Sequence, residues 1–138
     1  MLKMKNINAI KYLVGSKNIS KRSVLPYDNN ICNFLGDLSD ELNLNRESKN
    51  YPDIKTLAFW CRRQNINNLK KKFLSNETRV GLGLIFHITP SNIPTNFAYS
   101  LIFGLITGNS NIIKVPTQNF SQVQIICKSI NKLLKKKI

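Results

Sequence analysis

Residues 80–88 read VGLGLIFHI, followed by TPSNIP at 89–94, an apolar segment at 95–107 and NIIKV at 111–115. A short apolar run between turn residues is typical of a strand buried on both faces. Two prolines and an asparagine cannot continue a central strand, so 89–94 is a predicted turn. The segment 95–107 predicts a buried helix and 111–115 a second strand. Together they form a βαβ unit, whose right-handed crossover makes the two strands parallel.

The segments beyond this unit are predicted to be helical. Gly108 and Asn109 form a helix stop after the first crossover, and Pro116 ends the second strand. An amphipathic helix follows, and its lysines at 135–137 suit the negative end of the helix dipole. Its apolar positions recur at helical spacing: Val123, Ile126, Cys127, Ile130, Leu133 and Leu134.

The first half of the chain predicts helices without an evident catalytic constellation. Asp28 is a predicted N-cap for an amphipathic helix, and Pro52 fits the first turn of a second helix that ends near residue 63. Residues 64–73 predict another short helix, whereas residues 1–25 predict either a short helix with a loop or a frayed arm. The apolar face of the first helix consists of Ile31, Phe34, Leu35, Leu38 and Leu42.

These patterns predict an α/β protein with three parts. Residues 1–27 form a basic N-terminal arm, 28–78 a helical segment, and 79–138 an incomplete α/β unit of the order βαβα. The chain has 138 residues and 42% hydrophobic residues, which is enough for a buried core.

The formal net charge of +14 raises the question of an anionic partner. The lysines are spread out apart from 70–72 and 135–137. The abundance of Asn and Ile favours a net charge that reflects overall amino-acid composition. A charge that serves an anionic partner remains the alternative. The aromatic residues lie in apolar runs rather than among basic ones, which disfavours a specific nucleic-acid-binding module. The longest apolar stretch, 97–106, is about half of a membrane span. No secretion signal is visible in residues 1–14, so we expect a cytoplasmic protein.

The three cysteines, Cys32, Cys61 and Cys127, are widely spaced and are not accompanied by a histidine pair. A disulfide framework or a metal site is therefore not expected, and a reducing compartment fits. All three are predicted on helices, with Cys127 on an apolar face.

Ligands of open α/β sheets bind beyond the carboxyl ends of the strands. This rule selects the turn 89–94 and the segment 114–117. Neighbouring strands lie about 5 Å apart, so Ser91, Asn92 and Lys114 should share one edge of the sheet. An Asn amide there suits a developing oxyanion, and a Lys suits a ribose or phosphate.

The motifs TPSNIP (89–94), GNS (108–110) and IKVP (113–116) resemble the first nucleotide-binding βαβ unit of the aldehyde dehydrogenase superfamily. The longer string FHITPSNIPTNFAYSLIFGLITGNSNIIKVP is more specific. It is similar to the acyl-CoA reductase family, which includes the fatty-acid reductase subunit of bacterial bioluminescence operons. Residues 31–42 and 51–65 also look like that family, so the resemblance covers roughly residues 25–138.

The resemblance implies NADPH-dependent reduction of an acyl-CoA, or another activated acyl group, to an aldehyde through a thioester on a cysteine. It implies that Asn92 helps to hold the oxyanion and that Lys114 contacts the adenosine ribose. Thr117 stands where NAD-preferring relatives carry an acidic residue, which leaves room for the 2′-phosphate of NADP. The turn residues Thr89, Pro90 and Ser91 are then also cofactor-binding.

The family's nucleophilic cysteine lies far downstream of the oxyanion asparagine, so we expect this chain to lack it and to be inactive alone. Two interpretations stay open: the N-terminal part of a fatty-acyl-CoA reductase, or an inactive remnant or interaction subunit. A homo-oligomer or a separate C-terminal partner chain would fit either. His87 is expected to be a hydrogen-bonded core residue rather than a catalyst. Phe59 and Trp60 are expected to pack their helix, with an acyl-site lining as the alternative.

Overall fold

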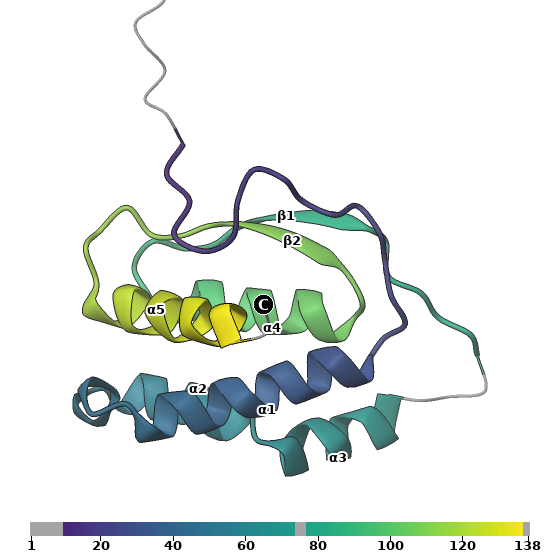
Figure 1. The fold of residues 1–138 in the computed structure, drawn as a ribbon, viewed down its shortest axis with the longest axis horizontal. Helices are drawn as coiled ribbons and strands as arrows, with labels where there is room; N and C mark the ends of the chain where they lie inside the picture. Colours follow the sequence, from purple (N-terminus) through teal and green to yellow (C-terminus); the bar gives the residue numbers. More distant parts are fainter. Residues whose placement is uncertain (1–9, 74–76, 137–138) are drawn as a thin grey trace, which may run out of the picture.

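The computed structural model describes residues 10–73 and 77–136 (Figure 1). Within these residues the chain is a mixed α/β protein with five α-helices, one 3-10 helix and a two-stranded parallel sheet. In chain order the elements are α1 (Asn29–Leu44), η1 (Glu47–Asn50), α2 (Pro52–Trp60), α3 (Arg63–Phe73), β1 (Leu84–Ile88), α4 (Asn96–Ile106), β2 (Ser110–Lys114) and α5 (Ser121–Lys136).

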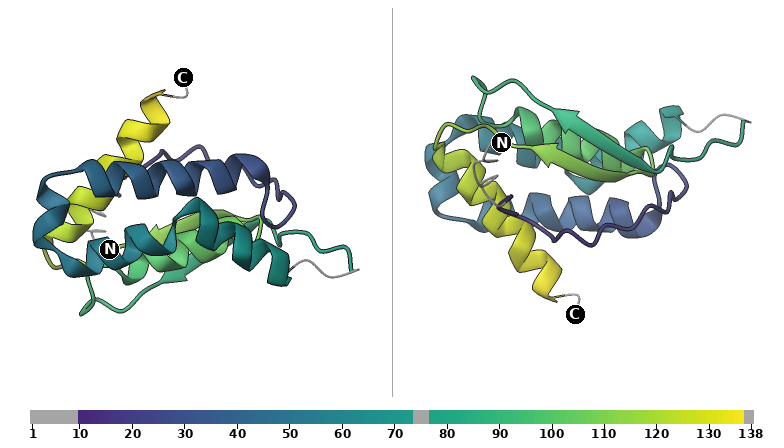
Figure 2. Two further views of the ribbon diagram at one scale, coloured as in Figure 1. Left: turned by 90° about the horizontal axis from the view of Figure 1, so that it is seen from below. Right: turned by 90° about the horizontal axis from the view of Figure 1, so that it is seen from above.

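The elements are stacked in layers beneath one face of the sheet. Figure 1 shows the strands at the top, α4 and α5 below them, and α1, α2 and α3 at the bottom. The crossover helix α4 packs on both strands, and α5 packs on α1. This arrangement places every described helix on the same side of the sheet, as the views in Figure 2 also show.

The predicted βαβ unit is confirmed. Strands β1 and β2 are parallel neighbours, with Leu84 opposite Ser110 and Ile88 opposite Lys114. The predicted helix stop is also confirmed, since Gly108 takes a positive φ of 86° that favours glycine. A Cβ at this glycine would lie 2.1 Å from the carbonyl oxygen of Val24, so the close approach of the arm requires it as well.

Strand β1 begins at Leu84, four residues later than the apolar run. The reason lies in its two glycines. Gly83 has a φ of 109°, and a Cβ at Gly81 would lie 2.2 Å from the carbonyl oxygen of Gly108. The strand therefore begins only at Leu84, although the Gly83 carbonyl still accepts from the Ser110 N–H at 2.8 Å. The Gly81 N–H donates to the carbonyl of Val24 at 3.3 Å.

The helices of the first half form as predicted, with one boundary corrected. The Asp28 carboxylate caps α1 by accepting from two backbone N–H groups of the first turn, and Pro52 is in the first turn of α2. However, α2 ends at Trp60 rather than near residue 63. The side chain of Asn65 donates to the Trp60 carbonyl at 2.7 Å, which helps the chain to turn directly into α3. The expectation that Cys61 lies on a helix is therefore wrong, because it is in this turn.

Residues 10–25 form an arm without a helix or strand. Val24 N–H donates to the carbonyl of Gly108 at 2.9 Å, and just past the arm Tyr27 N–H donates to that of Ile106 at 2.7 Å. Near its start, the Leu13 carbonyl accepts a 2.7 Å bond from the Asn131 side chain of α5. The arm thus ties the end of α4 to α5. The remaining part of the predicted arm, residues 1–9, lies outside the described residues.

One apolar core runs through the helices of both halves of the chain. Helix α1 contributes a fully buried row, and α5 covers it from the other side. The largest fully buried apolar side chains are Leu35, Leu38, Leu42, Ile54, Leu57, Ile66, Ile102 and Ile126. Burial of such side chains supplies most of the stabilisation of a fold of this size.

The prediction that β1 is buried on both faces is wrong. The exposed fractions of Phe86 and Ile88 are 59% and 74%, and that of Leu82 just before the strand is 90%. The physical reason is that α4 covers only the opposite face, and no other described helix lies over this one. The prediction of a buried helix over 95–107 also fails at Phe103 of α4, which is half exposed.

Candidate functional site

The turn after β1 and the end of β2 lie at one edge of the sheet, as predicted. Ile88 and Lys114 are partners in the strand register. The Thr89 hydroxyl donates to the Lys114 carbonyl oxygen at 3.2 Å, which holds the two segments together beyond the ladder. Because both strands end here, this edge is where a ligand of an α/β sheet would be expected.

Asn92 lies in the turn between β1 and α4. Its side chain is exposed, as are those of Pro90 and Ser91. The turn leads into α4 at Thr95, which is buried but does not cap the helix with its hydroxyl. The N–H groups of Asn96 and Ala98 in the first turn instead donate to the carbonyls of Ile93 and Thr95, at 3.4 Å and 3.0 Å. The positive end of the α4 dipole still lies near the same edge, where it favours anions.

Lys114 and Thr117 flank the other half of this edge. Lys114 is the last residue of β2, and its side chain is exposed. Thr117 is also exposed, whereas Pro116 between them is buried and anchors the loop to the body of the protein. The arrangement places an ammonium group and a neutral hydroxyl on the loop that leads to α5. The structure thus brings the two segments together but leaves the chemical roles of their residues as predictions.

A hydrogen-bonded group between the sheet and α4 extends from His87 to the amino end of the strands. His87 Nε2 lies 2.8 Å from Asn111 Oδ1, and Asn111 Nδ2 donates to the Asn109 carbonyl at 2.8 Å. Since the amide oxygen of Asn111 must accept, His87 carries its proton on Nε2 in this arrangement. The Asn109 side chain in turn accepts from Gly83 N–H at 3.2 Å. His87 is therefore hydrogen-bonded, as predicted, but it is half-buried rather than a core residue.

Asn109 and Asn111 are structural residues that the sequence interpretation did not single out as partners of His87. The signal available was weak, because asparagines beside a helix stop are common and need no further explanation. Their role depends on Gly104, where a Cβ would lie 1.9 Å from Asn111 Oδ1. Only a glycine at this position of α4 lets the amide reach His87.

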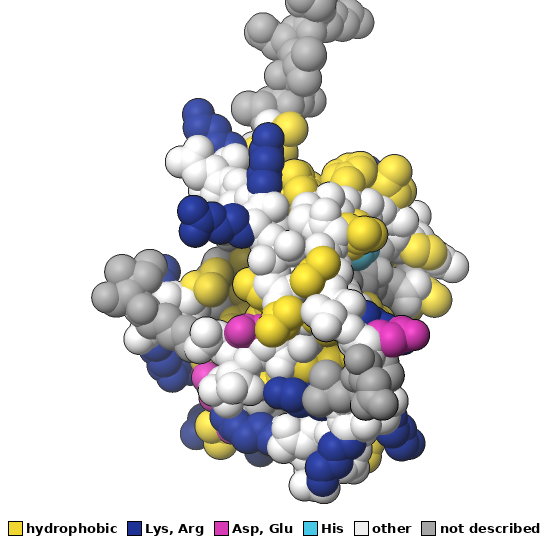
Figure 3. All heavy atoms as spheres, turned by 90° about the vertical axis from the view of Figure 1, so that its right-hand side faces the viewer, with side chains coloured by type: hydrophobic (Ala, Val, Ile, Leu, Met, Phe, Trp, Pro, Cys, Tyr) yellow, Lys and Arg dark blue, Asp and Glu magenta, His cyan; other side chains and the backbone are white. Residues whose placement is uncertain are grey.

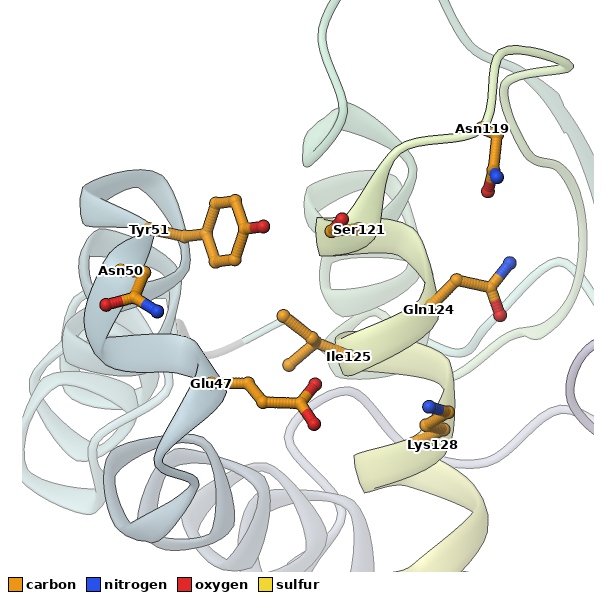
Figure 4. Close-up of a pocket in the computed structure, with 8 residues that line it drawn as sticks. All are labelled: Glu47, Asn50, Tyr51, Asn119, Ser121, Gln124, Ile125 and Lys128. Carbon is orange, nitrogen blue, oxygen red and sulfur yellow. The ribbon is translucent and has the colours of Figure 1, made fainter.

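A separate pocket of about 400 Å³ lies between η1 and the start of α5 (Figure 4). The Glu47 side chain extends from η1 toward α5, and the Tyr51 ring points toward Ser121. No predicted site residue lines this pocket, although its α5 wall begins soon after Thr117. Its lining is mostly polar and consists of Glu47, Asn50, Tyr51, Asn119, Ser121, Gln124, Ile125 and Lys128.

The cysteines are poor candidates for a thiolate nucleophile. Burial raises the pKa of Cys61 to about 12 and that of Cys127 to about 11. The pKa of Cys32 is also raised, chiefly by burial, and its thiol donates to the Tyr27 carbonyl at 3.5 Å. Protonated thiols are weak nucleophiles. Cys127 is a core residue, as predicted.

Trp60 packs against α4, with its ring centroid 5.2 Å from that of Phe103 and 6.5 Å from that of Tyr99. This confirms the prediction that it packs its helix. The same prediction is wrong for Phe59, whose exposed fraction is 56% and whose ring lies 4.0 Å from the Arg62 guanidinium carbon. The side chain of Phe59 points away from the core because the buried positions of α2 are Ile54, Leu57 and Ala58.

A comparison with known protein families matches residues 25–137 to the acyl-CoA reductase (LuxC) family. The match covers most of the chain and includes the whole βαβ unit. The chain belongs to the acyl-CoA reductase family. Reductases of this family use NADPH, and their substrates are acyl-CoA molecules. No curated protein and no solved structure matched the chain.

None of the chain's helices combines the length and the apolar character needed to cross a membrane in residues 10–73 and 77–136. In the same part of the chain, no group of three His, Cys, Asp or Glu side chains could hold a metal ion.

Proposed function

We propose that this chain supplies the cofactor-binding edge of an NADPH-dependent fatty-acyl-CoA reductase. The observation that carries the proposal is the joined edge itself, in which Thr89 hydrogen-bonds to Lys114 within a segment that matches the family. In this proposal β1, α4, β2 and α5 are the first βαβα unit of an aldehyde-dehydrogenase-type nucleotide-binding domain. In this proposal the protein works in the cytoplasm. Its three cysteines are all free thiols, which fits a reducing compartment.

Lys114 and Thr117 bind the adenosine half of the cofactor in this proposal. An ammonium group can donate to ribose hydroxyls and attract the 2′-phosphate without bidentate geometry. Thr117 is neutral, so it does not repel that phosphate. Thr89, Pro90 and Ser91 line the cofactor on the side of β1, close to the N-terminus of α4.

Asn92 stabilises the oxyanion that forms when an acyl group is attacked. Its amide N–H group is a suitable donor because it is exposed at the end of the turn rather than buried in the helix. The nucleophile that forms the thioester is not one of the cysteines of this chain, since their thiols are held protonated. A further segment or a partner chain supplies it, and the substrate is a fatty-acyl-CoA or another activated acyl group.

The alternative is an inactive remnant or interaction subunit of the family. The observation that favours it is the bare apolar face of β1, which suits assembly with another polypeptide.

The experiment compares variants in a full-length acyl-CoA reductase that carries this segment, with NADPH and NADH titrated by fluorescence. Thr117→Glu should weaken NADPH binding by about 2 kcal/mol, roughly thirtyfold, because a carboxylate would face the 2′-phosphate. Lys114→Ala should weaken both cofactors, and NADPH more. Asn92→Ala should lower the acyl-transfer rate about a hundredfold with little change in cofactor affinity.

Lys135→Ala is the matched control, because it removes the same charge from an exposed position near the end of α5. It should change neither cofactor affinity nor rate. An unchanged preference for NADPH over NADH in Thr117→Glu would show that this edge is not the ribose pocket.

A further inference from the structure

The sheet has one face that no described element covers. The register places Leu84, Phe86 and Ile88 on one face together with Ser110, Ile112 and Lys114. The other face meets α4, as the close approach of Asn111 to Gly104 shows. Figure 2, seen from above, shows the strands in front of α4 with no described helix over them. Parallel sheets are normally covered by helices on both faces.

Basic side chains outnumber acidic ones in the segments around this face. Residues 10–27 cover the arm and the turn after it, and residues 78–120 cover the sheet, α4 and their loops. Neither segment contains Asp or Glu. The acidic residues that border these segments are Asp28, which caps α1, and Glu77, which forms an ion pair with Arg79. In Figure 3, hydrophobic side chains gather on the upper right of the molecule and basic side chains lie to their left. The basic residues of these two segments are Lys11, Lys17, Lys21, Arg22, Arg79 and Lys114.

Leu84, Phe86 and Ile88 form an apolar stripe along β1, and a segment that carries a cation lies at each end of it. At the amino end of the strands, the Ser110 hydroxyl donates to the Arg22 carbonyl at 3.4 Å, so the backbone of the arm passes there. At the carboxyl end lies Lys114. Among the described residues, no acidic group forms an ion pair with either Arg22 or Lys114. A complementary surface would therefore be apolar in the middle and acidic at its margins.

Two other occupants fit this surface less well. A second copy of the chain, face to face, would oppose like charges in either strand orientation, because both Arg22 and Lys114 are cations. A lipid bilayer would have to accept the outer edge of β1, whose backbone groups lack a neighbouring strand among the described residues. Unpaired backbone groups do not enter hydrocarbon. A helix lying over the face leaves that edge in water.

We infer that the bare face of the sheet binds an amphipathic α-helix of a partner polypeptide. The apolar side of this helix covers Leu84, Phe86 and Ile88, and its flanking Asp and Glu residues pair with Arg22 and Lys114. The inference shares Lys114 with the proposed cofactor site, so its test uses substitutions at Arg22, Phe86 and Ile88, which lie outside that site.

The test uses two fluorescein-labelled peptides of about 18 residues, long enough for five helical turns. Both carry the same leucine stripe, flanked by Glu in one peptide and by Lys in the other. Anisotropy titration of the full chain should show binding of the Glu peptide. The affinity for the Lys peptide should be lower by roughly tenfold or more. Phe86→Ser/Ile88→Ser should weaken the Glu peptide by about tenfold or more, because it removes the apolar anchors.

Leu44→Ser is the matched control, since Leu44 is an equally exposed apolar side chain (79%) at the end of α1. It should leave binding unchanged. Arg22→Glu should weaken the Glu peptide and strengthen the Lys peptide, and this exchange does not depend on the folding of the double variant. Circular dichroism melting should give the same transition for all variants, because every substituted side chain is exposed.

Three results would overturn the inference. The first is equal affinity for the two peptides, or no binding of the Glu peptide. The second is a dimer in analytical ultracentrifugation that Phe86→Ser/Ile88→Ser dissociates, which would identify a second copy as the occupant. The third is co-sedimentation with vesicles of phosphatidylserine and phosphatidylcholine that the same double variant abolishes, which would identify a lipid surface.

Discussion

Replacement of Gly104 by alanine should destabilise the fold, although alanine is the better helix former. A Cβ at this position of α4 would lie 1.9 Å from Asn111 Oδ1 and 2.6 Å from its Cγ. The amide cannot move aside freely, because it is hydrogen-bonded to His87 and to the Asn109 carbonyl, both at 2.8 Å. The side chain must rotate and lose both bonds, or α4 must move away from β2.

Three contributions determine the change in the free energy of unfolding that Gly104→Ala should cause. Two hydrogen bonds of about 1 kcal/mol each are lost. Overpacking of the helix against the strand adds about 1–3 kcal/mol. The helix propensity of alanine returns about 1 kcal/mol. The expected change for Gly104→Ala is therefore a loss of about 2–4 kcal/mol in the free energy of unfolding, which is a large share of the stability of a small domain.

The assay is urea unfolding followed by circular dichroism, with Gly36→Ala as the matched control. Gly36 lies within α1, and the three atoms nearest to its added Cβ all belong to the side chain of Arg63, with Cγ at 2.6 Å. That side chain is half exposed and forms ion pairs with Asp37 and Asp40, which are exposed and contribute little. Arg63 can swing into solvent, so Gly36→Ala should change stability by less than about 1 kcal/mol.

A double-mutant cycle separates the clash from a general effect on the helix. Asn111→Ala removes the amide that collides with the new Cβ. The combination Gly104→Ala/Asn111→Ala should therefore be more stable than the sum of the single effects, by about 1–3 kcal/mol. If Gly104→Ala is neutral or stabilising, or if the two effects simply add, the close approach of α4 and β2 through this glycine is not what holds them together.

Further outcomes concern the cap, the thiols and turnover. Asp28→Ala should lower the free energy of unfolding by about 1 kcal/mol, because it removes the acceptor for two N–H groups of α1, and a change near zero in urea unfolding would contradict this cap. Ellman's reagent at pH 8 should modify Cys32 fastest and reach Cys61 and Cys127 only on unfolding; equal rates for all three would contradict their burial. The pKa of Cys61 is raised to about 12 from 9.0, so the unfolded chain loses this proton first and stability should fall as the pH rises above about 9, a slope that Cys61→Ala should reduce. The chain alone, incubated with a long-chain acyl-CoA and NADPH, should form no aldehyde, and aldehyde above background would show a competent nucleophile within it.

Local structure was determined by the sequence to a large extent. Asp28, Pro52 and Gly108 mark helix ends through short-range geometry, and each acts where it was expected. The parallel pairing of the two strands follows from the handedness of the crossover. The shared edge of Thr89 and Lys114 follows from that pairing, because the carboxyl ends of parallel strands meet on one side.

Other features depend on contacts between distant segments. The sequence alone does not show that the arm passes Gly108, that the Asn111 amide reaches His87 past Gly104, or that η1 and α5 enclose a pocket. These arise from side chains and backbone brought together by packing, and no short-range pattern encodes which asparagine finds which histidine.

The burial of β1 also shows which features the sequence determines and which depend on packing. Alternation and apolar character determine that Phe86 and Ile88 share a face and avoid water when a second layer is present. Whether a layer covers them is a property of tertiary structure, and in the described residues every helix packs on the other side. An apolar run therefore determines what a surface can bind, and only the arrangement of the elements decides whether that surface is core or interface.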